Sequence, residues 1–171
     1  MVEYLYQRMH ADDGTPAFAL LRMFQTSALR DLDAELQEIA RKFDTSYELK
    51  PDTTCLVLKG TVGMDPRWNE PARSRKHRVI PLPSAQAIDK LPMISRLIRQ
   101  LNVDVGDLTE GHERTMLQDI EANVFHVSQA EGSEFNPAQD DFVIPFKIES
   151  VVGFGDLLPG GELFAVIGFS R

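Results

Sequence analysis

The last thirty residues of the chain decide its fold: FVIPFKIESVVGFGDLLPGGELFAVIGFSR, from Phe142 to Arg171. Side chains alternate between two faces on either side of Leu158-Pro159-Gly160-Gly161, and a period of two residues is typical of β-strands. Before this segment, one face carries Phe146, Ile148, Ser150, Val152 and Phe154. After it, one face carries Leu163, Ala165, Ile167 and Phe169. The stretch therefore predicts a hairpin of two long strands in the middle of a sheet.

The segment between these strands has the residues of a tight turn. Pro159 presets φ at the first corner, and Gly160 tolerates the positive φ expected at the second. Gly153, Gly155 and Gly168 are unusual inside strands because glycine has no side chain to pack. They indicate a bulge, or a point where another backbone or a ligand comes close.

Length and composition favour one globular domain over residues 1–171. Of the 171 residues, 43% are hydrophobic and 26% charged, as in ordinary globular proteins. A chain of this size buries roughly two thirds of its unfolded surface, enough for one core. The net charge of −8 opposes broad binding to nucleic acid or to an anionic membrane.

The content of cysteine and the lengths of the apolar runs indicate a cytoplasmic protein. The single Cys55 excludes an internal disulfide and a multi-cysteine zinc site, which fits a reducing compartment. No apolar run approaches the ~20 residues of a membrane helix, and no signal peptide is visible.

The rest of the chain alternates between predicted helices and strands. Helices are expected at residues 1–9, 31–43, 84–91 and from Pro92 to Leu101, and strands at 17–25, 53–64, 79–83 and 123–127. A buried helix is the alternative for 17–25. Loops or connectors are expected at 65–78, 102–111 and 128–141. This order predicts an α+β fold, in which helices cover the faces of an antiparallel sheet.

A series of short motifs, in the same order along nearly the whole chain, resembles a known family. They include Ala19-Leu20-Leu21-Arg22-Met23-Phe24, Trp68-Asn69, Ile80-Pro81-Leu82-Pro83-Ser84, Pro92 to Leu101, Asn123-Val124-Phe125-His126-Val127, Pro137-Ala138-Gln139 and Val152-Gly153-Phe154-Gly155. In this order they are similar to the GAF-like sensor domains upstream of the kinase core in bacterial hybrid histidine kinases. The chain departs from the family at Asp156 and Gly168, and at Glu134 and Asn136.

The resemblance implies a six-stranded antiparallel sheet with helices on both sides, and a non-catalytic role in sensing or signal relay. It implies an unidentified small molecule and an output kinase or regulator domain as partners, and it names no cofactor. Because the chain starts inside a helical pattern and ends on a strand, we expect a module of a longer signalling protein. A ligand-free module that forms a homodimer is one alternative, and a small enzyme using Cys55 or a histidine is another.

The ligand is expected between the sheet and the loops 64–83 and 128–141. The candidate binding residues are Trp68, Arg75, His77, His126, Gln139 and Phe154. The basic stretch from Arg73 to Arg78 is suited to clamping a carboxylate or phosphate, since Arg pairs with such groups in a bidentate manner. The alternative for this stretch is a solvated loop. Trp68 equally fits a ring that stacks on a ligand or one that caps the core.

The remaining polar motifs give weaker indications. His112-Glu113-Arg114-Thr115 resembles a phospho-acceptor box, but it lacks the paired helices and nucleotide lid of a kinase. The spacing of His10, His77, His112, His126 and Cys55 matches no compact metal-ligand pattern. We therefore expect no metal site and no catalytic residue, and a buried, inert Cys55.

Overall fold

The computed structural model describes residues 1–74, 77–100, 105–110 and 124–171. The strands are β1 (Phe18–Ala28), β2 (Thr54–Gly63), β3 (Val79–Pro81), β4 (Val124–Val127), β5 (Ser150–Leu157) and β6 (Leu163–Ser170). The α-helices are α1 (Val2–Arg8), α2 (Ala34–Phe43), α3 (Ala85–Asp89), α4 (Pro92–Gln100) and α5 (Val105–Glu110). Short 3-10 turns occupy Leu29–Asp31, Pro66–Trp68 and Pro71–Arg73, and a π-helix spans Gln139–Val143.

The six strands form one open antiparallel sheet in the order β3-β2-β1-β6-β5-β4. The predicted hairpin is confirmed as β5 and β6, which are interior strands, and β1 lies between β2 and β6. Residues 17–25 therefore belong to a central strand, and the alternative of a buried helix is wrong. The predicted α+β class is confirmed.

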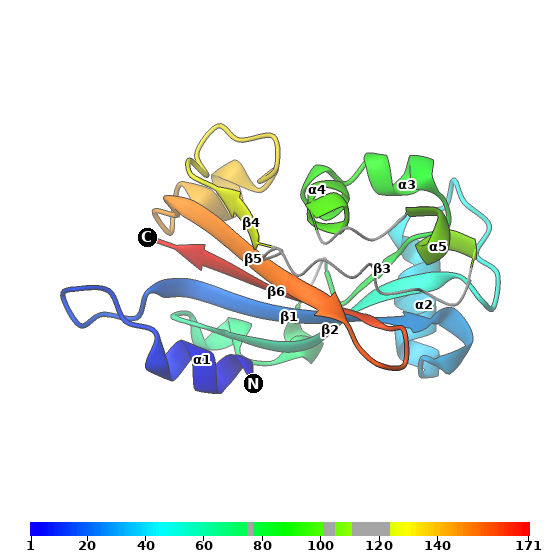
Figure 1. Ribbon diagram of the computed structural model, residues 1–171, viewed down its shortest axis with the longest axis horizontal. Helices are drawn as coiled ribbons and strands as arrows, with labels where there is room; N and C mark the ends of the chain where they lie inside the picture. Colours follow the sequence, from blue (N-terminus) through cyan, green and yellow to red (C-terminus); the bar gives the residue numbers. More distant parts are fainter. Residues whose placement is uncertain (75–76, 101–104, 111–123) are drawn as a thin grey trace.

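Helices cover both faces of the sheet (Figure 1). We name the face covered by α3, α4 and α5 the α4 face, and the opposite face, which carries α1 and α2, the α1 face. The largest apolar cluster lies on the α4 face, where side chains of β1, β2 and β6 pack with those of α3, α4 and α5. Two smaller clusters lie on the α1 face, one under α2 and one under α1.

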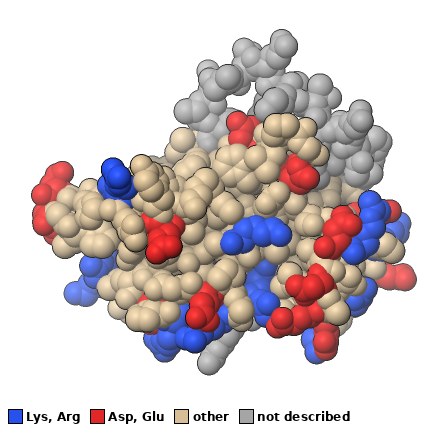
Figure 2. Space-filling view, turned by 90° about the horizontal axis from the view of Figure 1, so that it is seen from below, with Lys and Arg blue, Asp and Glu red and all other residues tan. Residues whose placement is uncertain are grey.

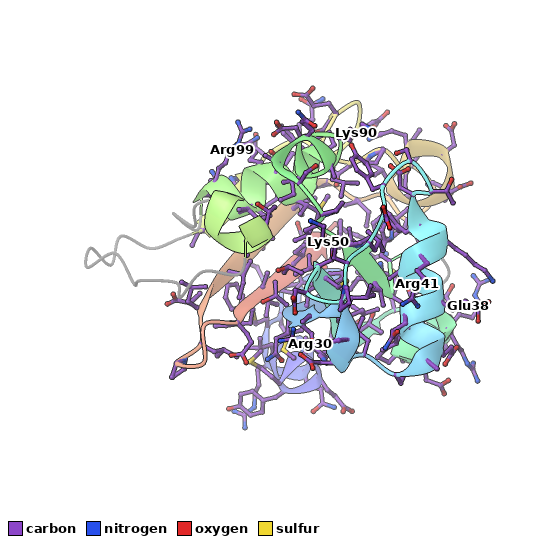
Figure 3. All side chains as sticks on the ribbon, turned by 90° about the vertical axis from the view of Figure 1, so that its right-hand side faces the viewer. Arg30, Glu38, Arg41, Lys50, Lys90 and Arg99 are labelled. Atoms are coloured by element: carbon purple, nitrogen blue, oxygen red, sulfur yellow. The ribbon has the colours of Figure 1, made fainter. Side chains whose placement is uncertain are left out.

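The helix starts follow from local capping. The carboxylate of Asp33 accepts a hydrogen bond from the N–H of Leu36 at 2.8 Å, which satisfies a free donor at the start of α2. Ser84 caps α3 in the same manner, at 3.2 Å from the N–H of Ala87. Outside the apolar stripe of α2, side chains such as Glu38 and Arg41 are exposed (Figure 3). None of the described helices has the length and apolar character needed to cross a membrane.

The predicted start of the closing hairpin is wrong. Residues 142–147 are not strand: the π-helix is followed by turns, and β5 begins only at Ser150. Phe142 and Phe146 are four residues apart and their rings lie 5.9 Å from each other, a contact that a helical turn produces and a strand does not. Lys147 ends the segment with a φ of 53°, in the left-handed region that non-glycine residues seldom adopt.

Two further details differ from the prediction. In the β5–β6 turn, the positive φ (84°) belongs to Gly161 rather than to Gly160, and the Gly161 N–H donates to the carbonyl of Leu158 at 2.8 Å. Within the expected connector at 102–111, residues 105–110 form α5. The sequence of α5 is polar, but Leu108 is fully buried against the α4-face core, and this burial holds the helix in place.

Candidate functional site

One row of residues crosses five strands on the α4 face. The pairing registers align Thr61 (β2), Arg22 (β1), Ile167 (β6), Gly153 (β5) and Phe125 (β4). Directly paired residues of neighbouring strands point to the same face of a sheet. Arg22 therefore lies on the central strand of this row, beside a hydroxyl on one side and an aliphatic residue on the other.

Arg22 is the only charged residue that the described strands place on the α4 face. The side chain is half-buried, and its Nε is sealed from solvent without a hydrogen-bond partner. No carboxylate among the described residues forms an ion pair with it. Burial lowers the pKa of Arg22, but an arginine starts so high that the guanidinium stays charged at neutral pH. Among the described residues, the site is thus a positive charge without an ion-pair partner in an apolar surrounding.

Thr61, the partner of Arg22 on β2, is also unsatisfied. Its hydroxyl is buried and has no hydrogen-bond partner. Two other buried threonines on the same face are satisfied: the Thr54 hydroxyl donates to the carbonyl of Leu108 at 2.5 Å, and the Thr26 hydroxyl accepts from the N–H of Leu163 at 2.8 Å. Because buried polar groups are nearly always paired, adjacent unpaired groups on Arg22 and Thr61 require an explanation.

A cluster of aromatic rings borders this polar pair. Phe169 is the residue of β6 diagonally across from Arg22, because Leu20 pairs with Phe169 and Arg22 with Ile167. The ring of Phe142 stands edge-on to that of Phe169 at 5.0 Å, and the ring of Trp68 lies 5.5 Å from that of Phe142. We name the rings of Trp68, Phe142, Phe146 and Phe169 the aromatic cluster; all four are half-buried.

Trp68 reaches the sheet because residue 63 is a glycine. A Cβ placed on Gly63 would lie 2.8 Å from the Trp68 ring and 2.7 Å from the carbonyl oxygen of Ala19, so no larger residue fits. Gly63 lies two positions from Thr61 on β2, which brings the indole next to the polar pair. In this structure Trp68 packs against the rings of Phe142 and Phe146, in line with the core-capping alternative.

The strand glycines accommodate protein side chains. A Cβ on Gly153 would lie 3.3 Å from Phe125 and 3.4 Å from Leu97 of α4, and one on Gly168 would lie 2.5 Å from the ring of Phe18. At these two positions the close approach comes mainly from side chains of the chain itself, whereas a bulge, another backbone or a ligand was expected. Gly153 lets α4 settle on the sheet beside Ile167.

Gln139 organises the loop between β4 and β5. Its amide nitrogen donates to the carbonyls of Asn136 at 2.7 Å and Ala130 at 3.0 Å, and its amide oxygen accepts from the N–H of Gly132 at 3.0 Å. These contacts give Gln139 a structural role in the loop. The side chain of Asn136 in the same loop is buried, and neither its oxygen nor its nitrogen has a partner.

Two other candidate residues, His126 and Phe154, are not brought together with Trp68. His126 and Phe154 lie on neighbouring strands on the α1 face, because their register partners are Val152 and Val124. His126 is exposed and Phe154 is 39% exposed. His77 is also exposed. Arg75 and the box at His112 lie outside the described residues.

Two arginines of the basic stretch already hold carboxylates of the chain. The guanidinium of Arg78 forms two bonds to Glu35 of α2, at 2.6 and 3.3 Å, and Arg73 pairs with Glu70 at 2.7 Å. The hydrogen bond and the charge of Arg78 lower the pKa of Glu35. These pairs leave neither arginine free to clamp a ligand, and the exposed Arg73 fits the solvated-loop alternative, whereas the side chain of Arg78 is mostly buried. On the surface seen in Figure 2, basic and acidic side chains are interspersed.

Cys55 is completely buried on the α1 face, in the cluster under α2. Burial raises the pKa of its thiol to about 12, so the nucleophilic thiolate is scarce at neutral pH. The predicted burial of Cys55 is confirmed, and its unreactivity stays a prediction. The described residues contain no group of three or more His, Cys, Asp or Glu side chains that is arranged to hold a metal ion.

Two hollows lie away from the polar pair. One, of about 40 Å³, is lined by residues at the end of α2 and in α3, and by Tyr47 and Lys90. The ammonium of Lys90 lies 4.8 Å from the Tyr47 ring centre. The other is an open groove of about 470 Å³ beside the π-helix, lined among others by Glu131, Ile144 and Lys147. Neither hollow brings unpaired polar atoms together with an apolar wall, as the α4 face does.

Comparison with protein-family models, with curated proteins and with solved structures finds no match to the chain. Arg22 stands in one of the motifs that carry the family resemblance, but it is not among the predicted site residues. The available signal was a lone arginine in an apolar central strand, ALLRMF at positions 19–24.

Proposed function

We propose that the chain is a non-catalytic sensory domain of the GAF-like type. It binds a small molecule on the α4 face of the sheet and relays that binding to an attached output, such as a histidine kinase. The observation that carries this proposal is the half-buried Arg22, with its sealed and unpartnered Nε next to the unpartnered hydroxyl of Thr61. Groups of this kind cost free energy in a ligand-free fold, and they suit a site whose partner is a ligand.

The six-stranded antiparallel sheet with helices on both faces supports the GAF-like assignment, because the motif resemblance implies this architecture. The same strand offers a route for signal relay. Arg22 points to the α4 face, while its neighbours Leu21 and Met23 pack on the α1 face with Val2 and Leu5 of α1. A ligand that pulls on β1 would therefore bias the packing of α1.

Two measurements test the sensory role. Native mass spectrometry of the purified chain reports a co-purified ligand, and addition of that ligand should slow hydrogen exchange in β1 and change it in α1. A chain that carries no ligand and gains no thermal stability from any member of a broad metabolite library would contradict the proposal.

A second candidate is a ligand-free module that pairs with another copy of itself. It is favoured by Val124 and Phe154, which are directly paired on β4 and β5 and are 47% and 39% exposed on the α1 face. A concentration-dependent dimer by light scattering that Phe154→Ser abolishes would support this candidate. A monomer at all concentrations would exclude it.

A further inference from the structure

We propose that the ligand of the α4 face is a small organic monocarboxylate with a flat apolar body, and that Arg22 and Thr61 hold its carboxylate. This inference deepens the sensory function proposed above and rests on it. Arg22 lies on the central strand β1, and Thr61 is its direct partner on β2.

The charge of the site defines the head group. An arginine without a counter-ion in an apolar surrounding attracts an anion, and its planar fork matches the two oxygens of a carboxylate. Thr61 adds one neutral donor beside it. One cation and one hydroxyl balance a single negative charge, whereas phosphate recognition usually gathers several donors and cations around a charge approaching −2.

A long arginine side chain often runs over apolar surface and keeps its charged head in water. Such snorkelling explains the half-buried side chain of Arg22, but it gives no partner to a buried Nε or to a buried hydroxyl beside it. Here the Nε is sealed without any partner, and so is the facing hydroxyl of Thr61. The Arg22 Nε and the Thr61 hydroxyl are thus two neighbouring buried polar atoms without a protein partner, and a ligand that binds there would supply one.

The aromatic cluster defines the body of the ligand. Its rings are half-buried, so each retains a surface that a ligand can cover. Phe169 is the diagonal neighbour of Arg22, and Trp68 stands over Gly63, two positions from Thr61. A planar apolar group stacks favourably on such rings. A carboxylate on Arg22 therefore places an attached ring beside this cluster.

The test uses the full chain and two matched pairs of probes: benzoate with benzamide, and indole-3-acetate with indole-3-acetamide. Isothermal titration calorimetry should detect the two carboxylates and not the neutral amides. Arg22→Met should weaken carboxylate binding at least about tenfold, the effect of losing one charged hydrogen-bonding partner, and Thr61→Val several-fold. Arg73→Met removes the same charge from an exposed loop and should leave binding unchanged.

The stability of the ligand-free variants separates a binding role from a structural one. Arg22→Met should unfold at the same or a higher temperature than the parent chain, because it removes an unpaired charge from an apolar face. A structural arginine would instead lose stability on substitution. Arg22→Lys keeps the charge but loses the planar guanidinium, so it should lose part of the affinity for the carboxylates. This variant provides a second test if Arg22→Met does not fold.

The outcomes are distinguishable. Equal binding of carboxylate and amide, or unchanged carboxylate affinity in both Arg22 variants, overturns the inference and leaves the sensory role intact. Inorganic phosphate that binds at Arg22 and displaces benzoate would overturn the assignment to a carboxylate. If none of these probes binds and native mass spectrometry finds no ligand, both the inference and the proposed function fail.

Discussion

The hydroxyl of Thr54 donates to the backbone carbonyl of Leu108 at 2.5 Å, and this bond ties β2 to α5. Thr61, on the same strand and the same face, makes no such bond. The two buried threonines can therefore be compared directly, because they share residue type, strand and burial and differ in whether the hydroxyl is hydrogen-bonded.

Thr54→Val should destabilise the protein by about 1–2 kcal/mol because it leaves the Leu108 carbonyl without its partner. Thr61→Val should be neutral or should stabilise by up to about 1 kcal/mol, since it replaces an unsatisfied hydroxyl with a methyl group. Urea unfolding followed by Trp68 fluorescence measures both changes. A loss for Thr61→Val as large as that for Thr54→Val would mean that its hydroxyl has a structural partner.

Cys55 should be unreactive in the native chain. Its thiol is buried, and its pKa is raised to about 12, so a reagent such as 5,5′-dithiobis(2-nitrobenzoic acid) should modify it only after unfolding. Because the raised pKa favours the protonated thiol in the folded state, the contribution of Cys55 to stability is complete below the ordinary thiol pKa. It decreases as the pH rises from there towards 12. Rapid labelling of native protein at pH 8 would contradict this burial.

The ion pair between Glu35 and Arg78 should contribute to the free energy of unfolding, and this contribution should depend on salt and be lost at acidic pH. Arg78 lowers the pKa of Glu35, so this contribution is present above the ordinary pKa of glutamate, near ~4.3. It is lost as the pH falls through the lowered value in the folded protein. The difference in stability between the parent and Glu35→Gln should be constant from pH 6 to 8, vanish in acid and shrink in ~1 M salt. A difference that persists in strong acid would require another cause.

Lys147 occupies a backbone conformation that favours glycine, with a φ of 53°. Lys147→Gly should therefore stabilise the protein by about 0.5–1 kcal/mol, and Lys147→Val should destabilise it by at least about 1 kcal/mol. Glu149→Gly, close by but without a positive φ, should lose stability instead and provides the control. If Lys147→Gly lowers the midpoint of urea unfolding, the turn before β5 has a different conformation in solution.

The sheet could be predicted from the sequence because its strands follow a clear period of two. Apolar residues occupy both faces of β1, and this pattern correctly indicated a central strand. The start of β5 could not be read in this way. Phe142 and Phe146 fit the alternation of a strand, but they are equally spaced for a helical turn, and the contact with Trp68 decides between them.

The candidate site was less predictable. Trp68 was named and does line the α4 face, whereas His126 and Phe154 lie on the opposite face. Arg22 was not predicted as a site residue, because an arginine in an apolar strand indicates a site only when the residues beside it on the neighbouring strands are known. The register that sets Thr61 against it and leaves both unpaired depends on an extra residue in β2, opposite Met23 and Phe24. No local pattern in the sequence reveals that bulge.

The most direct test of a ligand site on the α4 face is the Nε–H resonance of Arg22 in a nitrogen-15 NMR spectrum, assigned by its loss in Arg22→Lys. Titration with benzoate should shift this resonance saturably, together with backbone signals of β1 and β2, and benzamide should not. A resonance that stays fixed while benzoate shifts signals elsewhere, or shifts none, would contradict the central claim that Arg22 receives the ligand.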